Sequence, residues 1–300
     1  MQFRRAWKQV DGVLLLDKPE GMTSNEALQK VRRLFSAAKG GHTGTLDPMA
    51  TGLLPLCFGE ATKFSADLLD ADKTYEALVC LGSRTDTGDR EGKVLDTAPV
   101  NCSEADILAL LPRFTGPILQ VPPMYSALKR DGLPLHELAR QGLEVERQPR
   151  PVIIHALELL TCDLPLIRLR VTCSKGTYIR VLAEDLGKAL GCGAHLAGLR
   201  RTRVGPLDLD GAVPLAELEP LPEAELLVRL KPVDTLLASL PAVRLNGDGE
   251  ARFRHGNPVP APDGLLGQAR VYGPTHLLGV GEAKRDGKLW PRRLTVLSRP

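Results

Sequence analysis

One stretch stands out from the rest of the chain: Gly41-His42-Thr43-Gly44-Thr45-Leu46-Asp47-Pro48-Met49-Ala50-Thr51-Gly52. Three glycines within residues 40–44 allow tight turns, and Pro48 restricts the residue before it. The pattern predicts a loop that brings its backbone and the Asp47 carboxylate close to a ligand. Asp47 can instead be a helix N-cap with Pro48 at the first helical position. That is the commoner role of an isolated Asp-Pro pair, and both roles are compatible.

The residues before this stretch predict a strand followed by a helix. Val10 to Leu16 is a run of β-branched residues and leucine that ends at a Lys-Pro-Glu-Gly turn, so we expect a buried strand there. Thr23 and Glu26 form a capping box, and apolar residues continue at helical spacing. We therefore expect a helix from about Ser24 to Ala38, ended by the Gly40-Gly41 pair.

Apolar and alternating segments later in the chain predict further strands and helices. The expected strands are Lys73–Leu81, Gly92–Asp96, Val152–Leu160 and Leu166–Cys173, and the expected helices are Glu104–Phe114 and Val181–Leu190. A polar loop, residues 82–90, joins the first two strands and forms either a hairpin or the rim of an active site. The acidic and leucine-rich residues 215–238 predict a helical connector.

A basic polar stretch from Lys129 to Arg150 interrupts this pattern. It has helical character around Leu135 to Gln141. It is either an insertion, about residues 124–151, that grips a ligand, or a plain surface excursion, which is the commoner case. Near Leu240 the sequence pattern changes to short predicted strands separated by glycines and prolines. We therefore expect a large domain, residues 1–240, and a small β-barrel-like domain, residues 241–300.

The composition is that of a soluble globular protein, with 43% hydrophobic and 25% charged residues in a chain of 300. No run approaches the roughly 18 apolar residues that cross a bilayer, so we expect no membrane segment and a cytoplasmic location. The six cysteines are scattered without a C-x-x-C pair, which argues against a zinc site or redox motif. From Pro241 onward the net charge is +5, against −2 for the rest, which fits a polyanionic partner or a solvated face.

Several other residues are ambiguous on their own. His42 is a lone histidine, and such residues are more often structural than catalytic. Tyr75 lies in a predicted strand, where packing is its usual role. Tyr178 and Arg180 precede a predicted helix, where a half-buried tyrosine and a surface arginine are common. No dinucleotide loop, Walker A loop, G-x-S-x-G or zinc-binding helix motif is complete, so the sequence indicates no cofactor and no metal.

Together with other motifs in the same order along the chain, the 41–52 stretch closely resembles the signature of the bacterial TruB family of tRNA pseudouridine synthases. The resemblance covers about residues 10 to 210, and the C-terminal part more weakly resembles a PUA module. His136 departs from the tyrosine of the family pattern, which affects a local contact of the insertion. The further motifs are Leu16-Asp17-Lys18-Pro19, Gly59-Glu60-Ala61-Thr62-Lys63, Lys73-Thr74-Tyr75, Thr85-Asp86-Thr87-Gly88-Asp89, Pro122-Pro123-Met124-Tyr125-Ser126-Ala127, Gly176-Thr177-Tyr178-Ile179-Arg180, and Gly193-Ala194-His195 to Arg200-Arg201.

The resemblance implies an α+β fold in which a mixed central β-sheet has flanking helices, followed by a PUA domain. It implies an isomerase that flips the T-loop uridine (U55) of tRNA out of the stack, breaks its glycosidic bond and forms a C–C bond, without cofactor or metal. Asp47 is then the catalytic residue, and a pairing with Arg180 that lowers its pKa keeps it charged. The implied substrate-binding residues are His42 as a wedge in the T-loop, Tyr75 as a stacking platform, Tyr178, Leu199, Arg180 and Lys18.

Two other functions fit the same residues. One is an RNA-binding folding chaperone that opens the tRNA elbow without catalysis. The other is a guide-RNA-dependent synthase of the archaeal and eukaryotic kind, which works inside a multi-protein particle. The residues that follow Asp47 and the basic insertion favour the stand-alone bacterial branch. We therefore expect the tRNA T-arm stem-loop as partner, no guide RNA, no membrane and a monomeric protein.

Overall fold

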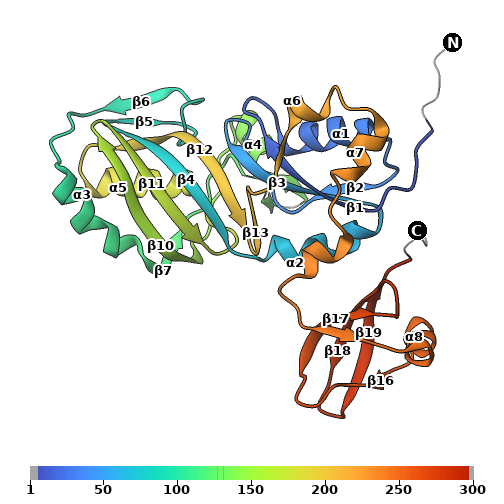
Figure 1. The fold of residues 1–300 in the computed structure, drawn as a ribbon. Helices are drawn as coiled ribbons and strands as arrows, with labels where there is room; N and C mark the ends of the chain where they lie inside the picture. The colour runs from blue at the N-terminus through green and yellow to red at the C-terminus, as the bar shows by residue number, and fades with distance from the viewer. Residues whose placement is uncertain (1–5, 127, 131, 297–300) are drawn as a thin grey trace.

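The computed structural model describes residues 6–296 except 127 and 131, and it contains two separate main β-sheets with helices packed around them (Figure 1). The expected α+β class with a mixed sheet is confirmed. Across the described part of the chain, no helix combines the length and hydrophobicity that a bilayer crossing requires. The side chain of His136 lies outside what the structure describes.

The larger sheet has ten strands, and its main path runs β14-β1-β3-β12-β4-β11-β10-β7, with β2 beside β3 and β13 beside β12. The β1–β14 and β3–β12 pairs are parallel, and the others are antiparallel. The strands are β1 (Gly12–Lys18), β2 (Gly40–His42), β3 (Thr51–Phe58), β4 (Lys73–Leu81), β7 (Gly116–Gln120), β10 (Arg150–Asp163), β11 (Leu166–Cys173), β12 (Ala194–Val204), β13 (Leu207–Asp208) and β14 (Val213–Pro214).

Strand β12 connects the two halves of this sheet. It pairs with β4 along most of its length and meets β3 only at Arg200–Thr51 and Arg201–Gly52. This strand was not expected, because three arginines among its last five residues hide the apolar alternation. Through β12, the loop that precedes β3 comes to lie beside β4.

Helix α1 (Ser24–Leu34) begins with the expected capping box between Thr23 and Glu26. Its predicted end at Ala38 was wrong, because Ser36 adopts a left-handed φ of 51° and Ala37 N donates to Arg32 O at 3.0 Å. Glycine usually occupies such a position, so a serine gives no sequence signal for the helix end. The Gly40-Gly41 pair consequently belongs to β2 rather than to a helix cap.

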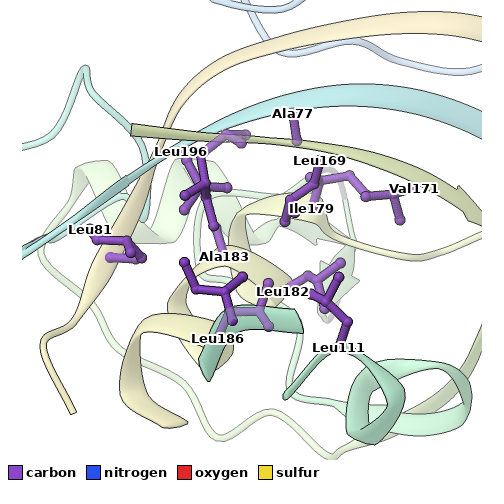
Figure 2. Close-up of a cluster of buried hydrophobic side chains, with 14 of the residues drawn as sticks. Ala77, Leu81, Leu111, Leu169, Val171, Ile179, Leu182, Ala183, Leu186 and Leu196 are labelled. Carbon is purple, nitrogen blue, oxygen red and sulfur yellow. The ribbon is translucent and has the colours of Figure 1, made fainter. Parts of the chain in front are cut away.

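The main hydrophobic core lies between one face of β4, β11, β10 and β12 and three helical segments (Figure 2). These are α3 (Glu104–Leu110), the 3-10 turn η2 (Leu111–Phe114) and α5 (Ile179–Ala189). Leu182, Ala183 and Leu186 of α5 all point into it. Burying each leucine contributes about 1.5–3 kcal/mol, so this core fixes the start of α5 against the sheet.

Both faces of β1 and β3 are buried, which explains their nearly continuous apolar sequences. Helices α1, α6 (Leu215–Leu218) and α7 (Glu223–Val228) pack on one face, where Phe35 and Phe58 stack with ring centroids 5.3 Å apart. The other face packs against η1 (Gly59–Phe64), α2 (Ser65–Leu69) and η3 (Val233–Leu237). The predicted helical connector thus takes the form of α6, α7 and η3.

The C-terminal part forms a five-stranded sheet with its own core around Phe253. It meets the larger part through Leu277 and Val280, and Tyr272 Oη donates to Asp234 Oδ2 at 2.5 Å. Its elements are β15 (Ala242–Arg244), α8 (Gly247–Arg254), β16 (Val259–Pro260), β17 (Gly267–Tyr272), β18 (Leu277–Ala283) and β19 (Lys288–Leu294). Two short hairpins, β5 (Ser83–Thr85) with β6 (Val94–Thr97) and β8 (Lys129–Arg130) with β9 (Leu133–Pro134), and helix α4 (Leu135–Arg140) complete the fold.

Gly52 permits the close approach of β3 to β12. Its φ is +97°, and an added Cβ would lie 2.3 Å from the backbone oxygen of Arg201. We expect Gly52→Ala to lower the free energy of unfolding by at least about 3 kcal/mol, from backbone strain plus overpacking. Gly21→Ala is the matched control, because Gly21 has φ +80° with open space around it and should lose only about 1–2 kcal/mol. Equal losses in urea denaturation would contradict the close contact.

Candidate active site

A cavity of about 250 Å³ opens where the loop after β2 meets β4, β12 and the turn before α5. Among the described residues, a larger cavity of about 840 Å³ lies beside η3 and the β12–β13 turn, but it is lined by none of the side chains predicted for the site. The smaller cavity brings together five of the seven predicted side chains, namely Asp47, Tyr75, Tyr178, Arg180 and Leu199. It is therefore the candidate active site.

Asp47 lies in an irregular loop that is tied to α1. Ser24 Oγ accepts a hydrogen bond from Leu46 N at 2.7 Å and donates one to Leu46 O at 3.1 Å. After Asp47 the chain makes one turn, in which Ala50 N donates to Asp47 O at 3.0 Å, and β3 follows directly. The alternative role of Asp47 as a helix N-cap is therefore wrong, because no helix begins at this described residue.

Arg180, in the first turn of α5, holds the Asp47 carboxylate. Its Nε lies 3.0 Å from Asp47 Oδ2, and its Nη1 lies 3.5 Å from Asp89 Oδ2. Nη1 also donates to Thr87 O at 3.0 Å, and Nη2 donates to Tyr125 O at 2.7 Å. Since Arg180 is only 5% exposed, these four partners fix the plane of its guanidinium and so the position of Asp47.

Asp89 is presented to Arg180 by the polar loop that joins β5 to β6. Thr87 Oγ1 and Glu91 N donate to Asp89 Oδ1 at 2.6 and 3.1 Å, and Thr85 Oγ1 donates to Asp89 O at 2.6 Å. For the polar residues 82–90, a hairpin and the rim of an active site were both expected alternatives. Both alternatives hold: β5 and β6 pair as an antiparallel hairpin, and their loop places the Asp89 carboxylate beside the candidate site.

The charge state of Asp47 is set by opposing effects. Burial raises the pKa of Asp47 above its ordinary value, the Arg180 cation opposes that rise, and the Asp89 anion adds to it. Arg180 lowers the pKa of Asp47 as expected, but burial has the larger effect, so the net shift is upward. Loss of solvation outweighs the ion pair, so the site contains a carboxylate that binds its proton more tightly than an exposed aspartate does.

Two of the predicted tyrosines and the predicted leucine form part of the cavity wall. Tyr75 lies on β4, and Leu199 lies on β12 opposite that strand. Tyr178 precedes α5, where its N–H donates to Gln120 Oε1 at 3.0 Å and its carbonyl accepts from Gln120 Nε2 at 3.3 Å. Burial raises the pKa of both phenols, so both stay protonated at neutral pH. The cavity wall is therefore partly aromatic and apolar, with Asp47 as its acidic group and Lys73, Arg180 and Arg201 as basic ones.

Lys18 and His42 are the two predicted site residues that do not line this cavity. Lys18 is fully buried, and its Nζ donates to the carbonyls of Pro19, Met22 and Pro48 at 2.8, 2.6 and 3.3 Å. The predicted role of Lys18 in substrate binding is therefore corrected, because a completely covered ammonium that ties the chain just after Asp47 cannot touch a substrate. His42, on β2, lies just before the loop that carries Asp47.

Sequence reasoning did not assign three side chains that the structure places in or beside the site: Asp89, Gln120 and Arg201. Asp89 and Arg201 belong to motifs of the resemblance, but each of the three side chains contacts a partner far away along the chain, so its role does not follow from neighbouring residues. Among the described residues, no group of three or more His, Cys, Asp or Glu side chains is close enough to hold a metal ion.

Family models match three consecutive parts of the chain. The N-terminal domain of the TruB family pseudouridylate synthases matches residues 32–179. The tRNA pseudouridylate synthase B C-terminal domain matches residues 180–238, and the C-terminal domain of pseudouridine synthase II TruB matches residues 241–295. The match therefore continues through the second sheet.

Curated relatives are similar over nearly the whole chain. A tRNA pseudouridine synthase B from Dechloromonas aromatica is 67% identical over 99% of this chain and 100% of its own length. Proteins of the same name from Aromatoleum aromaticum and Burkholderia lata are 58% and 59% identical, over 98% and 96% of this chain and 95% and 91% of their own.

Solved structures with a similar fold include chains of larger assemblies. A chain of a Cbf5-Nop10-Gar1 complex aligns with a TM-score of 0.70 and 28% identity over 96% of this chain and 84% of its own. A chain of an H/ACA ribonucleoprotein bound to a substrate RNA containing 2′-deoxyuridine gives a TM-score of 0.70 and 25% identity, over 96% and 85% of the two chains.

Proposed function

Because the chain belongs to the TruB family of pseudouridylate synthases and is a tRNA pseudouridine synthase, we propose that it isomerises the T-loop uridine (U55) of tRNA without a guide RNA. The observation that carries the proposal is the cavity in which Arg180 holds Asp47 between two tyrosines and a leucine. It has room for one extruded base, and an ionisable carboxylate lies at its wall. The identity of up to 67% with bacterial synthases favours the guide-free reaction.

The reaction rearranges bonds within one nucleoside. The bond from ribose C1′ to base N1 breaks, a bond from C1′ to C5 forms, and the C5 proton is lost while N1 gains one. No electrons are exchanged with another molecule, so an oxidant or reductant has no part in the balance. An ionised Asp47 acts either by attacking C1′ or C6 or by removing a proton from the sugar, and all three require the carboxylate form.

The target base must leave its stack to reach Asp47, at a cost of a few kcal/mol. Stacking on an aromatic side chain returns about 1–3 kcal/mol per base. Tyr75 supplies that surface in our proposal, Tyr178 and Leu199 close the pocket, and His42 fills the space that the base vacates. The basic C-terminal sheet provides further contact with the tRNA phosphates, and we propose that the protein acts as a cytoplasmic monomer.

The pH dependence of the rate tests the role of Asp47. Since burial raises the pKa of Asp47, the single-turnover rate should fall on the acidic side at a higher pH than for an exposed aspartate. Asp89→Asn removes a negative charge that contributes to that rise, so the fall should move to lower pH. Rates measured at saturating enzyme from about pH 4.5 to 8 would show it. A shift to higher pH in Asp89→Asn would contradict the assignment.

The direct test of function is tritium release from a T-arm stem-loop RNA with C5-labelled uridine, using the purified protein alone. Release is expected, because forming the C1′–C5 bond expels the C5 proton. No release despite RNA binding would instead support a folding chaperone, or a guide-dependent synthase if added guide RNA restores activity.

A further inference from the structure

Arg201 is a buried arginine in the wall of the candidate active site, and the mechanism above does not use it. It lies on β12 at the point where this strand meets both β3 and β4, and it is 1% exposed. An arginine this deeply covered loses nearly all its hydration, which costs several kcal/mol unless other groups replace the water.

The groups that replace water are backbone carbonyls of the Asp47 loop and of β3. Arg201 Nη2 donates to Gly44 O at 3.1 Å, Nη1 donates to Thr45 O at 3.4 Å, and Nε donates to Leu53 O at 2.8 Å. Gly44 and Thr45 lie three and two residues before Asp47. The guanidinium therefore holds the loop at Gly44 and Thr45, in addition to the contact of Ser24 with Leu46.

The same guanidinium lies beside the phenol of Tyr75, which is directly across from Arg201 in the β4–β12 register and lines the same cavity. Because the guanidinium carries a positive charge and only donors, it attracts the lone pairs of the Tyr75 oxygen. Among the described residues, no carboxylate lies within 4 Å of the Arg201 nitrogens. Its charge is therefore balanced by carbonyl and phenol dipoles rather than by an ion pair.

We propose that Arg201 is a positioning residue, one planar group that fixes the Asp47 loop and the Tyr75 ring relative to each other. The flipped base then meets a stacking surface and a carboxylate that keep a constant separation. A planar fork with donors in three directions serves this purpose, whereas the single ammonium of a lysine does not. This inference rests on the proposed function, since it predicts the rate of that reaction.

The test compares Arg201→Lys, Arg201→Gln, Tyr75→Phe and the double variant Arg201→Lys/Tyr75→Phe. Single-turnover tritium release, the Kd for the T-arm RNA and the Tm are measured for each. Arg200→Gln is the matched control on the same strand, because Arg200 points away from the cavity to Asp17, with Nη2 2.7 Å from Oδ2. We expect the control to react within about threefold of wild type, as for a surface ion pair.

Arg201→Lys should react about 100-fold more slowly than wild type at a temperature where it is fully folded, with a Kd within about threefold, because a misplacement near 1 Å has an effect of that size. The rate losses of Arg201→Lys and Tyr75→Phe should not be independent. The rate of the double variant should therefore fall by clearly less than the product of the two single-variant factors. A merely structural arginine would change the Tm and leave both the rate of the folded protein and this coupling unaffected.

An Arg201→Lys rate within threefold of wild type, or independent losses in the double variant, would overturn the proposal. If neither Arg201 variant folds, Tyr75→Phe tests the proposal, because it removes the hydroxyl that faces the Arg201 guanidinium. An unchanged single-turnover rate in Tyr75→Phe would then overturn the proposal. An inactive wild type would refute the proposed function instead, so the two failures are distinguishable.

Discussion

Asp47→Asn is expected to abolish turnover while the RNA still binds. The amide keeps the shape of the side chain and still accepts a hydrogen bond from Arg180 Nε, now 3.0 Å from the carboxylate. It cannot attack carbon or take a proton, so the single-turnover rate should fall by at least about 10⁴-fold, the scale seen when a nucleophile or its base is removed. Tritium release and the Kd for the T-arm RNA, measured on the same preparation, check both halves of the prediction.

The same substitution should not destabilise the protein at neutral pH. The raised pKa of Asp47 means that its protonated form favours folding below the ordinary pKa, and that this contribution disappears as the pH rises through the folded value. At pH 7 the ionised carboxylate is therefore a local cost that asparagine removes. The Tm of Asp47→Asn should equal or exceed that of wild type at pH 7, and this advantage should shrink in acid. Substantial residual turnover, or a Tm several degrees lower at pH 7, would contradict our account of the site.

Local sequence patterns predicted many of the secondary structure elements well. Strands β4 and β11 have the expected bounds, and the capping box at Thr23 starts α1 where expected. These features depend on neighbours within a few residues, so the sequence contains their cause. The end of α1 differs because Ser36 takes a backbone conformation that glycine usually occupies, and tertiary contacts override that preference.

The site was harder to predict because its geometry depends on contacts between distant segments. The motif resemblance named Asp47, Tyr75, Tyr178, Arg180 and Leu199, and the fold brings all five to one cavity. Nothing in the sequence, however, shows that Lys18 is covered or that burial outweighs Arg180 in setting the pKa of Asp47. The burial of Lys18 and the raised pKa of Asp47 both depend on how far the folded chain excludes water from these side chains. That exclusion depends on the packing of all the surrounding strands and helices.

Arg180→Ala is expected to weaken both the fold and the reaction. It leaves the carboxylates of Asp47 and Asp89, now 3.0 and 3.5 Å from the same guanidinium, facing each other without a cation. The Arg180–Asp89 pair is buried on both sides, and breaking such a pair costs about 3–5 kcal/mol of stability, whereas the partly exposed Asp47 adds less. The pKa of Asp47 should rise further, since Arg180 opposes the effect of burial, and the single-turnover rate should drop by about 10³-fold from lost charge and orientation.

Urea denaturation and single-turnover kinetics measure the two losses, with Arg170→Ala as the matched control. Arg170 is about half exposed and pairs with Glu158 at 3.4 Å on the surface, so its removal should cost less than about 1 kcal/mol. Adding Asp89→Asn to Arg180→Ala removes the second charge and should recover part of the stability but little of the rate, because Asp47 still has no partner to orient it. If the double variant regained neither, carboxylate repulsion would not be the cause of the instability, and the role of Arg180 would be packing alone.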